Sequence, residues 1–255
     1  MNIEMGNKLN KLLQYWQPGV LFFSSWLKKN GYSDQLMQQY RKSGWFSMLS
    51  KGVMYRMGDK LSSYVAITSY NTQVNKFFYV GAHSALELSG FNHFVPMGKP
   101  VLMIGHPQQD KVPDWMKDTD FDYELKFFST KIFSNPQLTN FIKGDCKILA
   151  SAPEQAFLEC LLLAPNQYAY IDLFYIMEQL TTFRSEVVQE LLENTGNIKI
   201  KRLFLYLAQK AGHEWFDKLD KTRIELGTGK QKLSDNGVYL PEFLITIPKE
   251  LYEYE

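Results

Sequence analysis

The chain has 255 residues, of which 45% are hydrophobic and 15% aromatic, and its formal net charge is +1. This length and composition predict one or two folded domains with a sizeable core and exclude a disordered chain. Two cysteines, Cys146 and Cys160, are too few for a disulfide framework or a four-cysteine zinc site. No signal-peptide core and no apolar run long enough to cross a bilayer is present, so we expect a cytoplasmic protein without membrane association.

The charge is unevenly distributed along the chain. Residues 1–60 contain nine Lys and Arg but only three acidic residues, a balance of +6, and the rest of the chain carries −5. A basic end is typical of proteins that bind nucleic acid. The N-terminal segment is therefore where we look for such a site.

The chain begins with a predicted amphipathic helix that Asn7 would cap. Its apolar face repeats at helical spacing and consists of Leu9, Leu12, Leu13 and Trp16. The run Gln17-Pro18-Gly19 would end this helix, and residues 20–23 then form a short apolar strand.

The next stretch predicts two short helices joined by a tight turn. The first would start at Ser24 or Ser25, whose hydroxyl can cap it, and end at Asn30-Gly31. Ser33 would cap the second helix and Gly44 would end it. In the second helix the inward positions are Leu36, Met37 and Tyr40, and the opposite face carries Gln35, Gln38, Gln39 and Lys42.

This polar face suits a DNA-recognition helix, because a glutamine amide can bond an adenine edge in the major groove while Arg41 and Lys42 bind phosphates. Residues 45–49 and 53–56 then read as two strands around a turn with Lys51 at its tip, which is the wing of a winged helix-turn-helix. Taken alone, a Gln/Lys face is more often an ordinary solvated surface. The order helix, turn, helix and wing favours DNA binding.

We place the first domain at 1–58 and a larger second domain at 59–255, and predict the α+β class for the whole chain. The second domain alternates strand-like and helical runs. The predicted strands are 77–80, 101–104, 123–128 and 147–150, and the predicted helices begin near 61, 84, 114, 153, 171, 185 and 200. Residues 223–226 and 243–247 complete the tail, with 227–230 read as a hairpin turn rather than a phosphate-binding loop.

Nothing in the sequence assembles a catalytic or metal site, so we predict no enzyme and no cofactor. His83 and Ser84 are adjacent and would diverge by about 100° on a helix, so we read His83 as a capping or packing residue. His93 and His106 stand without a metal-ligand spacing. We expect Cys146 near the surface and Cys160 in a helix core.

Several segments in a fixed order resemble the AbiEi-type antitoxins, the regulator half of type IV abortive-infection toxin–antitoxin pairs. The resemblance runs from about residue 7 to about residue 250. It starts in the helix-turn-helix, at Ser24-Ser25-Trp26-Leu27, Leu36, Tyr40 and Ser43-Gly44-Trp45, and continues through residues 81–88, 151–156, 201–204, 212–216 and 226–230. Asp34 and the glutamine-rich face depart from the more basic helix of similar proteins, so the operator sequence does not carry over.

The resemblance implies an N-terminal winged helix-turn-helix domain, a larger α+β antitoxin domain and two roles. The protein would bind inverted repeats in its own promoter and repress it, and would counteract a nucleotidyltransferase-like toxin, with direct contact left open. For the repressor role we expect base contacts from Gln35, Gln38 and Gln39, and phosphate contacts from Lys28, Lys29, Arg41, Lys42, Lys51 and Arg56. For the antitoxin role the candidates are Lys199, Arg202 and Lys210, although such cations often serve only the helix dipole and solubility.

Two other functions stay open at the level of sequence. One is a stand-alone winged-helix transcription factor whose second domain senses a ligand or partner. The other is an enzyme that acts on nucleic acid and uses the winged helix for targeting.

Overall fold

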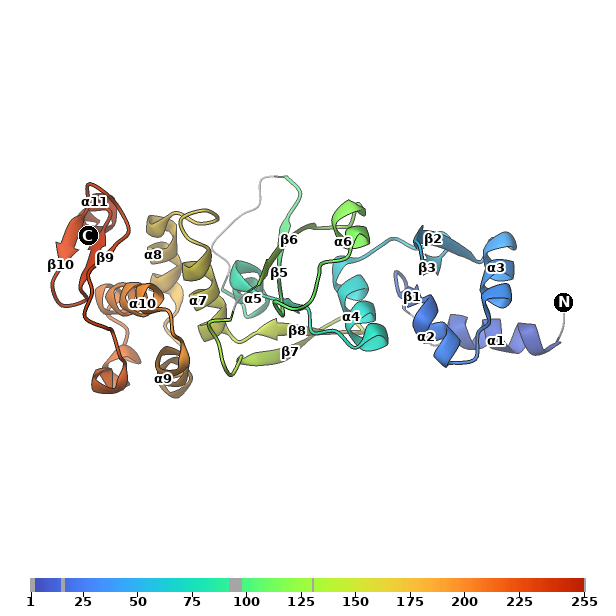
Figure 1. The fold of residues 1–255 in the computed structure, drawn as a ribbon, viewed down its shortest axis with the longest axis horizontal. Helices are drawn as coiled ribbons and strands as arrows, with labels where there is room; N and C mark the ends of the chain where they lie inside the picture. Colours follow the sequence, from blue (N-terminus) through green and yellow to red (C-terminus); the bar gives the residue numbers. More distant parts are fainter. Residues whose placement is uncertain (1–2, 15–16, 92–97, 130, 255) are drawn as a thin grey trace. The chain divides into compact units, whose positions relative to one another are not determined.

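The computed structural model describes residues 3–14, 17–91, 98–129 and 131–254 (Figure 1). The chain folds into two compact units, and each contains segments from separate parts of the sequence. The first consists of Met1–Tyr79, Pro96–Phe128 and Asn140–Leu149, and the second of Val80–Val95, Ser129–Thr139 and Ala150–Glu255. The mixed α+β class is confirmed, while the domain boundary at residue 58 stays a prediction. None of the described helices is both long and apolar enough to cross a membrane.

The first unit opens with helices and a small sheet in the predicted order. These elements are α1 (Ile3–Gln14), β1 (Leu21–Phe23), α2 (Ser24–Lys29), α3 (Asp34–Lys42), β2 (Phe46–Ser50) and β3 (Val53–Arg56). The strands lie in the order β1-β3-β2 and all pairs are antiparallel. This topology matches the one expected of a winged helix-turn-helix.

Two predicted helix caps are wrong. Asn7 lies inside α1, because that helix begins at Ile3. The residue before α2 is Phe23, and no side chain caps this helix, since the chain turns directly from β1 into α2. The face of α1 is only partly described: Leu9 and Leu12 are buried, and Trp16 lies outside the described residues.

The outer edge of β1 is closed by side chains of α4 (Ser63–Val74) rather than by another strand. The Leu21 N–H donates to Ser69 Oγ at 3.3 Å, and the Phe23 N–H donates to Gln73 Oε1 at 3.0 Å. Gln73 Nε2 returns a bond to the Leu21 carbonyl at 2.7 Å. Because buried backbone groups are costly when unpaired, these bonds stabilise the small sheet and fix it to α4.

A second, five-stranded sheet has the order β6-β5-β4-β8-β7. Its strands are β4 (Tyr79–Val80), β5 (Val101–His106), β6 (Glu124–Ser129), β7 (Leu138–Lys143) and β8 (Cys146–Ser151), and α6 (Asp114–Asp118) precedes β6. The sequence missed β7, because its half-exposed residues show neither an apolar run nor a clean alternation. Cys146 is buried against Thr68 at 3.3 Å between sulfur and oxygen, so the expected surface position is wrong.

The second unit is built mainly from helices. They are α5 (Ala82–Leu88), α7 (Pro153–Leu163), α8 (Tyr170–Gln179), α9 (Ser185–Asn194), α10 (Ile198–Ala211) and α11 (Lys249–Glu253), with the short turns η1 (Phe216–Lys218) and η2 (Lys221–Arg223). A small sheet ends the chain in the order β10-β11-β9, formed by β9 (Gln231–Lys232), β10 (Val238–Leu240) and β11 (Ile245–Ile247). The predicted helices at 153, 171, 185 and 200 are confirmed, and Pro153 occupies the first turn of α7 as expected.

A buried carboxylate joins α5 to α7. Glu159 accepts the backbone N–H of Ala82 at 2.8 Å, the hydroxyl of Ser151 at 2.9 Å and the amide of Gln155 at 2.8 Å. Ala82 has a φ of +48°, an uncommon value for a residue with a side chain. Two of the segments that carry the family resemblance, 81–88 and 151–156, thus meet in the core.

A partly buried ion pair anchors the start of α9. Arg184 donates to Glu154 from Nε and from its backbone N–H at 2.9 and 3.0 Å. Burial raises the pKa of Glu154, but these bonds outweigh it and hold the pKa below the usual value for a glutamate.

Replacing Gln73 with Met keeps the side-chain volume but leaves the Phe23 N–H and the Leu21 carbonyl without partners. We expect Gln73→Met to lower the free energy of unfolding by about 2–4 kcal/mol in urea titrations, because each unmet buried group costs about 1–3 kcal/mol. The matched control is Thr72→Val, since Thr72 is exposed and bonds only carbonyls of its own helix. Equal stability of the two variants would show that the β1 edge does not depend on Gln73.

Candidate nucleic-acid interface

The turn between α2 and α3 is fixed by a glycine and a serine. Gly31 has a φ of +82°, which glycine adopts at little cost. The Ser33 hydroxyl accepts the Leu36 N–H at 3.2 Å, which confirms the predicted cap of α3. Between them, Tyr32 is buried and donates its hydroxyl to the Lys8 carbonyl on α1 at 3.2 Å. These contacts set the orientation of α3 against α1 and α2.

Helix α3 has one buried and one exposed face, as predicted. Leu36, Met37 and Tyr40 are buried. The exposed side chains of the opposite face are Gln35, Gln38, Gln39 and Lys42. Side chains three and four residues apart point the same way, so the three amides form one surface that can reach base edges. Contact with DNA itself stays a prediction.

A groove of about 470 Å³ separates α3 from the wing, which is the β2–β3 hairpin. Buried apolar side chains line it together with exposed polar ones. Of the predicted DNA contacts, the groove is lined by Lys28, Gln35, Gln38, Arg41 and Lys51. The side chains of Lys29, Gln39, Lys42 and Arg56 lie outside the groove lining. One concave surface therefore gathers amides from α3 with cations from α2, α3 and the wing.

Two of the groove cations already have partners within the unit. Lys28 Nζ lies 2.8 Å from Asp34 Oδ2, and both side chains are more than half exposed. Arg41 Nη1 lies 3.0 Å from the sulfur of Met48 on β2, so this guanidinium reaches toward the wing. An exposed ion pair of this kind is weak in water and can open when a phosphate competes.

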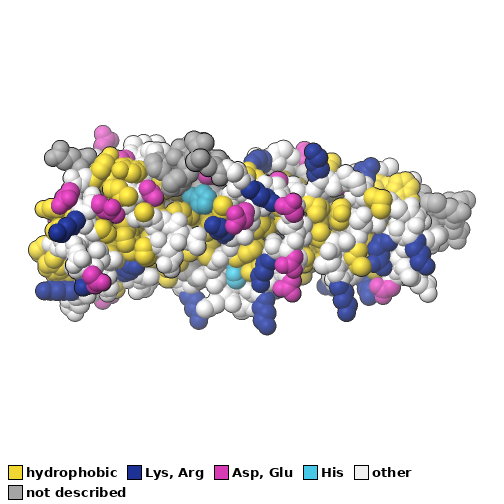
Figure 2. Space-filling model, turned by 90° about the horizontal axis from the view of Figure 1, so that it is seen from above, with side chains coloured by type: hydrophobic (Ala, Val, Ile, Leu, Met, Phe, Trp, Pro, Cys, Tyr) yellow, Lys and Arg dark blue, Asp and Glu magenta, His cyan; other side chains and the backbone are white. Residues whose placement is uncertain are grey.

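The remaining predicted phosphate contacts are exposed. No ion pair among the described residues involves Lys29, Lys42, Lys51 or Arg56. Figure 2 shows Lys and Arg side chains at the surface, alongside apolar side chains. Exposed cations beside a groove provide the sequence-independent part of DNA affinity.

The cations predicted for the antitoxin surface do not form one exposed patch. Arg202 is fully buried, so the prediction that it lies on an exposed basic face is wrong. Lys199 is half-buried with its ammonium 6.0 Å from the centre of the Tyr170 ring. Lys210, also half-buried, donates to the Tyr254 carbonyl, and its ammonium lies 5.5 Å from the Phe174 ring. The role of these two lysines stays a prediction.

Arg202 binds the C-terminal tail instead. Its guanidinium donates to the carbonyls of Leu226 at 2.9 Å, Gly229 at 2.6 Å, Leu244 at 2.7 Å and Gly227 at 3.1 Å. Residues 227–230 are therefore not a hairpin turn, because no strand lies between η2 and this segment and the carbonyls of Gly227 and Gly229 bind a buried cation. Two more of the segments that carry the resemblance, 201–204 and 226–230, meet here.

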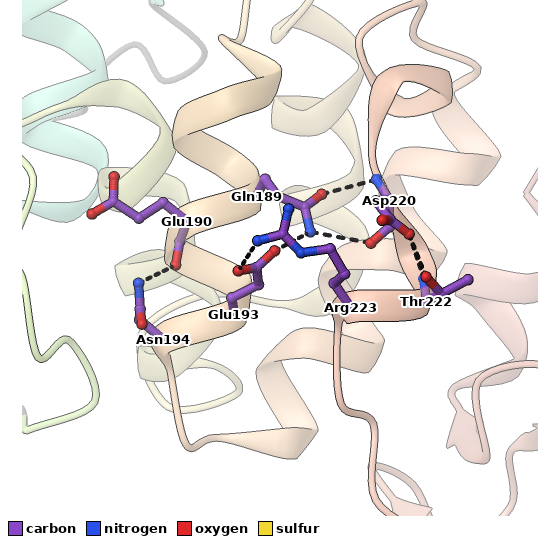
Figure 3. Close-up of polar contacts among 7 residues, drawn as sticks. All are labelled: Gln189, Glu190, Glu193, Asn194, Asp220, Thr222 and Arg223. Atoms are coloured by element: carbon purple, nitrogen blue, oxygen red, sulfur yellow. Dashed lines mark hydrogen bonds and ion pairs between the residues drawn. The ribbon is translucent and has the colours of Figure 1, made fainter.

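Polar side chains on α9 bind the turn η2 (Figure 3). Gln189 forms a two-way bond with the backbone of Asp220, accepting its N–H at 3.0 Å and donating to its carbonyl at 3.1 Å. Glu193 accepts Nη2 of Arg223 at 2.9 Å and the Gln189 amide at 2.6 Å. These contacts hold the tail against α9, so the cation of Arg223 has a structural partner.

The histidines considered for catalysis have structural contacts. His83 Nδ1 lies 2.7 Å from the Tyr168 hydroxyl, and its Nε2 lies 3.4 Å from Ser84 Oγ. Ser84 is nevertheless buried, and α5 has no side-chain cap, so His83 packs rather than caps. His106 stacks on Phe78 with ring centres 5.2 Å apart, and His93 lies outside the described residues. No group of three possible metal ligands occurs among the described residues.

Comparisons with known proteins cover nearly the whole chain. Residues 99–248 match a family model described as transcriptional regulator, AbiEi antitoxin, type IV TA system, and residues 5–97 match the model of the AbiEi antitoxin N-terminal domain. A search of curated proteins gave no match. The crystal structure of the RV2827C protein from Mycobacterium tuberculosis superposes with a TM-score of 0.64 at 15% identity, covering 96% of this chain and 91% of that chain. That similarity shows a shared fold.

Loss of the Arg202 guanidinium should unfold the tail. We expect Arg202→Met to lower the free energy of unfolding by about 3 kcal/mol or more in urea titrations, because bonds to a charged donor are worth about 1.5–3 kcal/mol each. Lys199→Met, one turn earlier on α10, should change it by less than about 1 kcal/mol. A small effect of Arg202→Met would mean that other groups satisfy the four carbonyls.

Proposed function

Because the chain belongs to the AbiEi antitoxin family of type IV toxin–antitoxin systems, a family of transcriptional regulators, we propose that it represses its own operon. In this proposal α3 enters the major groove of inverted repeats in the promoter, and the wing contacts the flanking backbone. The observation that carries the proposal is the exposed amide face of α3, bordered by cations from three elements around one groove.

The division of labour within this surface follows from the chemistry of its side chains. Gln35, Gln38 and Gln39 carry no charge, so they add little to affinity for phosphate and are suited to reading base edges. The lysines and arginines bind any sequence and position the protein. Specificity and affinity are thus assigned to different residues, which makes them separable by mutation.

The second part of the proposal is that the chain counteracts a nucleotidyltransferase-like toxin encoded beside it. Family membership supports the antitoxin role, and the half-buried lysines Lys199 and Lys210 are the candidate contacts. Neither role requires a catalytic residue in this chain. The proposal covers both a toxin that the chain contacts directly and a toxin whose effect it opposes without a stable complex.

Gel-shift titrations on the upstream DNA can distinguish residues that contribute affinity from residues that contribute specificity. Lys42→Glu should weaken binding to operator and scrambled DNA alike by about tenfold or more and flatten the salt dependence by about one unit of slope. Gln38→Ala with Gln39→Ala should instead lower the operator-to-scrambled ratio, since a bidentate base contact is worth about 1–3 kcal/mol.

The control for charge is Lys117→Glu, which changes an exposed lysine of α6 in the same unit by the same amount. It should leave the affinity close to wild type. Operator binding that is competed fully by scrambled DNA, or full discrimination by the double glutamine variant, would contradict the assignment.

The antitoxin prediction uses growth rescue in cells that express the neighbouring toxin. Charge reversal at Lys199 and Lys210 together should abolish rescue and leave operator binding unchanged, because the two lysines belong to α10 rather than to the groove. Reversal of the exposed Lys218 and Lys249 makes the same change of charge and should rescue normally. Rescue at the wild-type level by the first pair, with a urea midpoint that shows it is folded, would remove these lysines from the site.

A further inference from the structure

We propose that Asp34 is a specificity-determining residue that favours cytosine at one operator position and weakens binding to all other DNA. The inference rests on the proposed operator binding and names a residue that the nine predicted contacts do not include. Asp34 is the first residue of α3, and its side chain is 73% exposed and lines the groove between α3 and the wing.

The carboxylate of Asp34 is unfavourable on a surface whose only task is to bind phosphate. The groove is otherwise lined by cations and uncharged side chains, so Asp34 is opposite in sign to the other charges of the surface and has the same sign as the DNA ligand. A negative charge near DNA is repelled by every phosphate and therefore lowers affinity for any sequence. Such a repulsive element raises discrimination when one base offsets it.

Stabilisation of α3 does not require this residue. Ser33 already caps the helix, and a carboxylate in the first turn adds about 0.3–1 kcal/mol through the helix dipole. The side chain is also held by a partner from another element: Lys28 of α2 lies 2.8 Å from Oδ2. In the free protein this exposed pair keeps the carboxylate among the groove-lining side chains, one turn before Gln38, and it can open when DNA binds.

The preferred base follows from the groove edges of the four bases. A carboxylate only accepts hydrogen bonds. Guanine and thymine present acceptors in the major groove, and adenine pairs its amino donor with an acceptor at N7, whereas cytosine presents its N4 amino group alone. A single carboxylate at the N-terminal end of the recognition helix therefore favours cytosine. Lys28 remains beside it to neutralise the charge or to turn to a phosphate.

The test compares Asp34→Ala and Asp34→Asn with the wild type on two kinds of duplex. Each full-length protein selects sites from a randomised DNA pool, and affinities are then measured for the wild-type site and for a random-sequence duplex. We expect Asp34→Ala to bind the random duplex about two- to fivefold more tightly. Its ratio of selected-site to random affinity should fall about tenfold, with loss of a cytosine preference at one position. Asp34→Asn should accept adenine there, because its amide both donates and accepts.

The matched control is Asp120→Asn. Asp120 is 96% exposed in the same unit and pairs with Lys99 at 2.5 Å, but it does not line the groove. Asp120→Asn changes the net charge as much as the Asp34 variants do. It should alter neither the ratio of selected-site to random affinity nor the base selected at the cytosine position. An unchanged ratio for Asp34→Ala, or the same gain in affinity for both carboxylates, would overturn the inference and leave the repressor function standing. If the wild type itself selects no site, the repressor function fails together with it.

Discussion

The first unit depends on the way in which α4 completes the edge of β1. A three-residue strand exposes backbone donors and acceptors that would attract another strand, and Ser69 and Gln73 occupy them with side-chain groups. On its other side β1 pairs with β3, the inner strand of the wing. The chain passes from β1 directly into α2, so the same contacts determine where the helix-turn-helix begins. The position of the candidate interface is therefore linked to a glutamine that lies outside it.

Local signals in the sequence predicted the interface elements well. Ser33 and Gly31 act within a few residues of where they stand. The spacing of Leu36, Met37 and Tyr40 identifies the buried side of α3 without reference to the rest of the chain. The edge contacts of β1 join residues that are 48 to 52 positions apart, and nothing in the pattern of either segment points to the other. The predicted exposure of Arg202 was wrong for the same reason. Helical periodicity cannot show that a distant loop covers that face of α10.

The electrostatics of the groove are more restrained than the count of basic residues suggests. Asp34 balances Lys28, so part of the local positive charge is neutralised in the free protein. The Met48 sulfur orients Arg41 toward the wing but leaves its charge unchanged. In the proposed complex, affinity for DNA comes from the exposed lysines and Arg56, and the amides and Asp34 are assigned to the bases. A surface of this kind has a lower affinity for non-specific DNA and a higher ratio of specific to non-specific affinity. Such a ratio suits a regulator that must find one site among many.

In the second unit the guanidinium of Arg202 binds three carbonyls of the loop before β9 and the carbonyl of the residue before β11. Helix α10 and everything after Leu226 are thereby joined into one piece that cannot be exchanged in parts. A chimaera that takes its tail from a relative has to take α10 with it, and a label fused near residue 244 would disturb the helix as much as the tail. The practical unit of engineering in this half of the protein is residues 198–254, because α10 also binds the carbonyls of Leu251 and Tyr254.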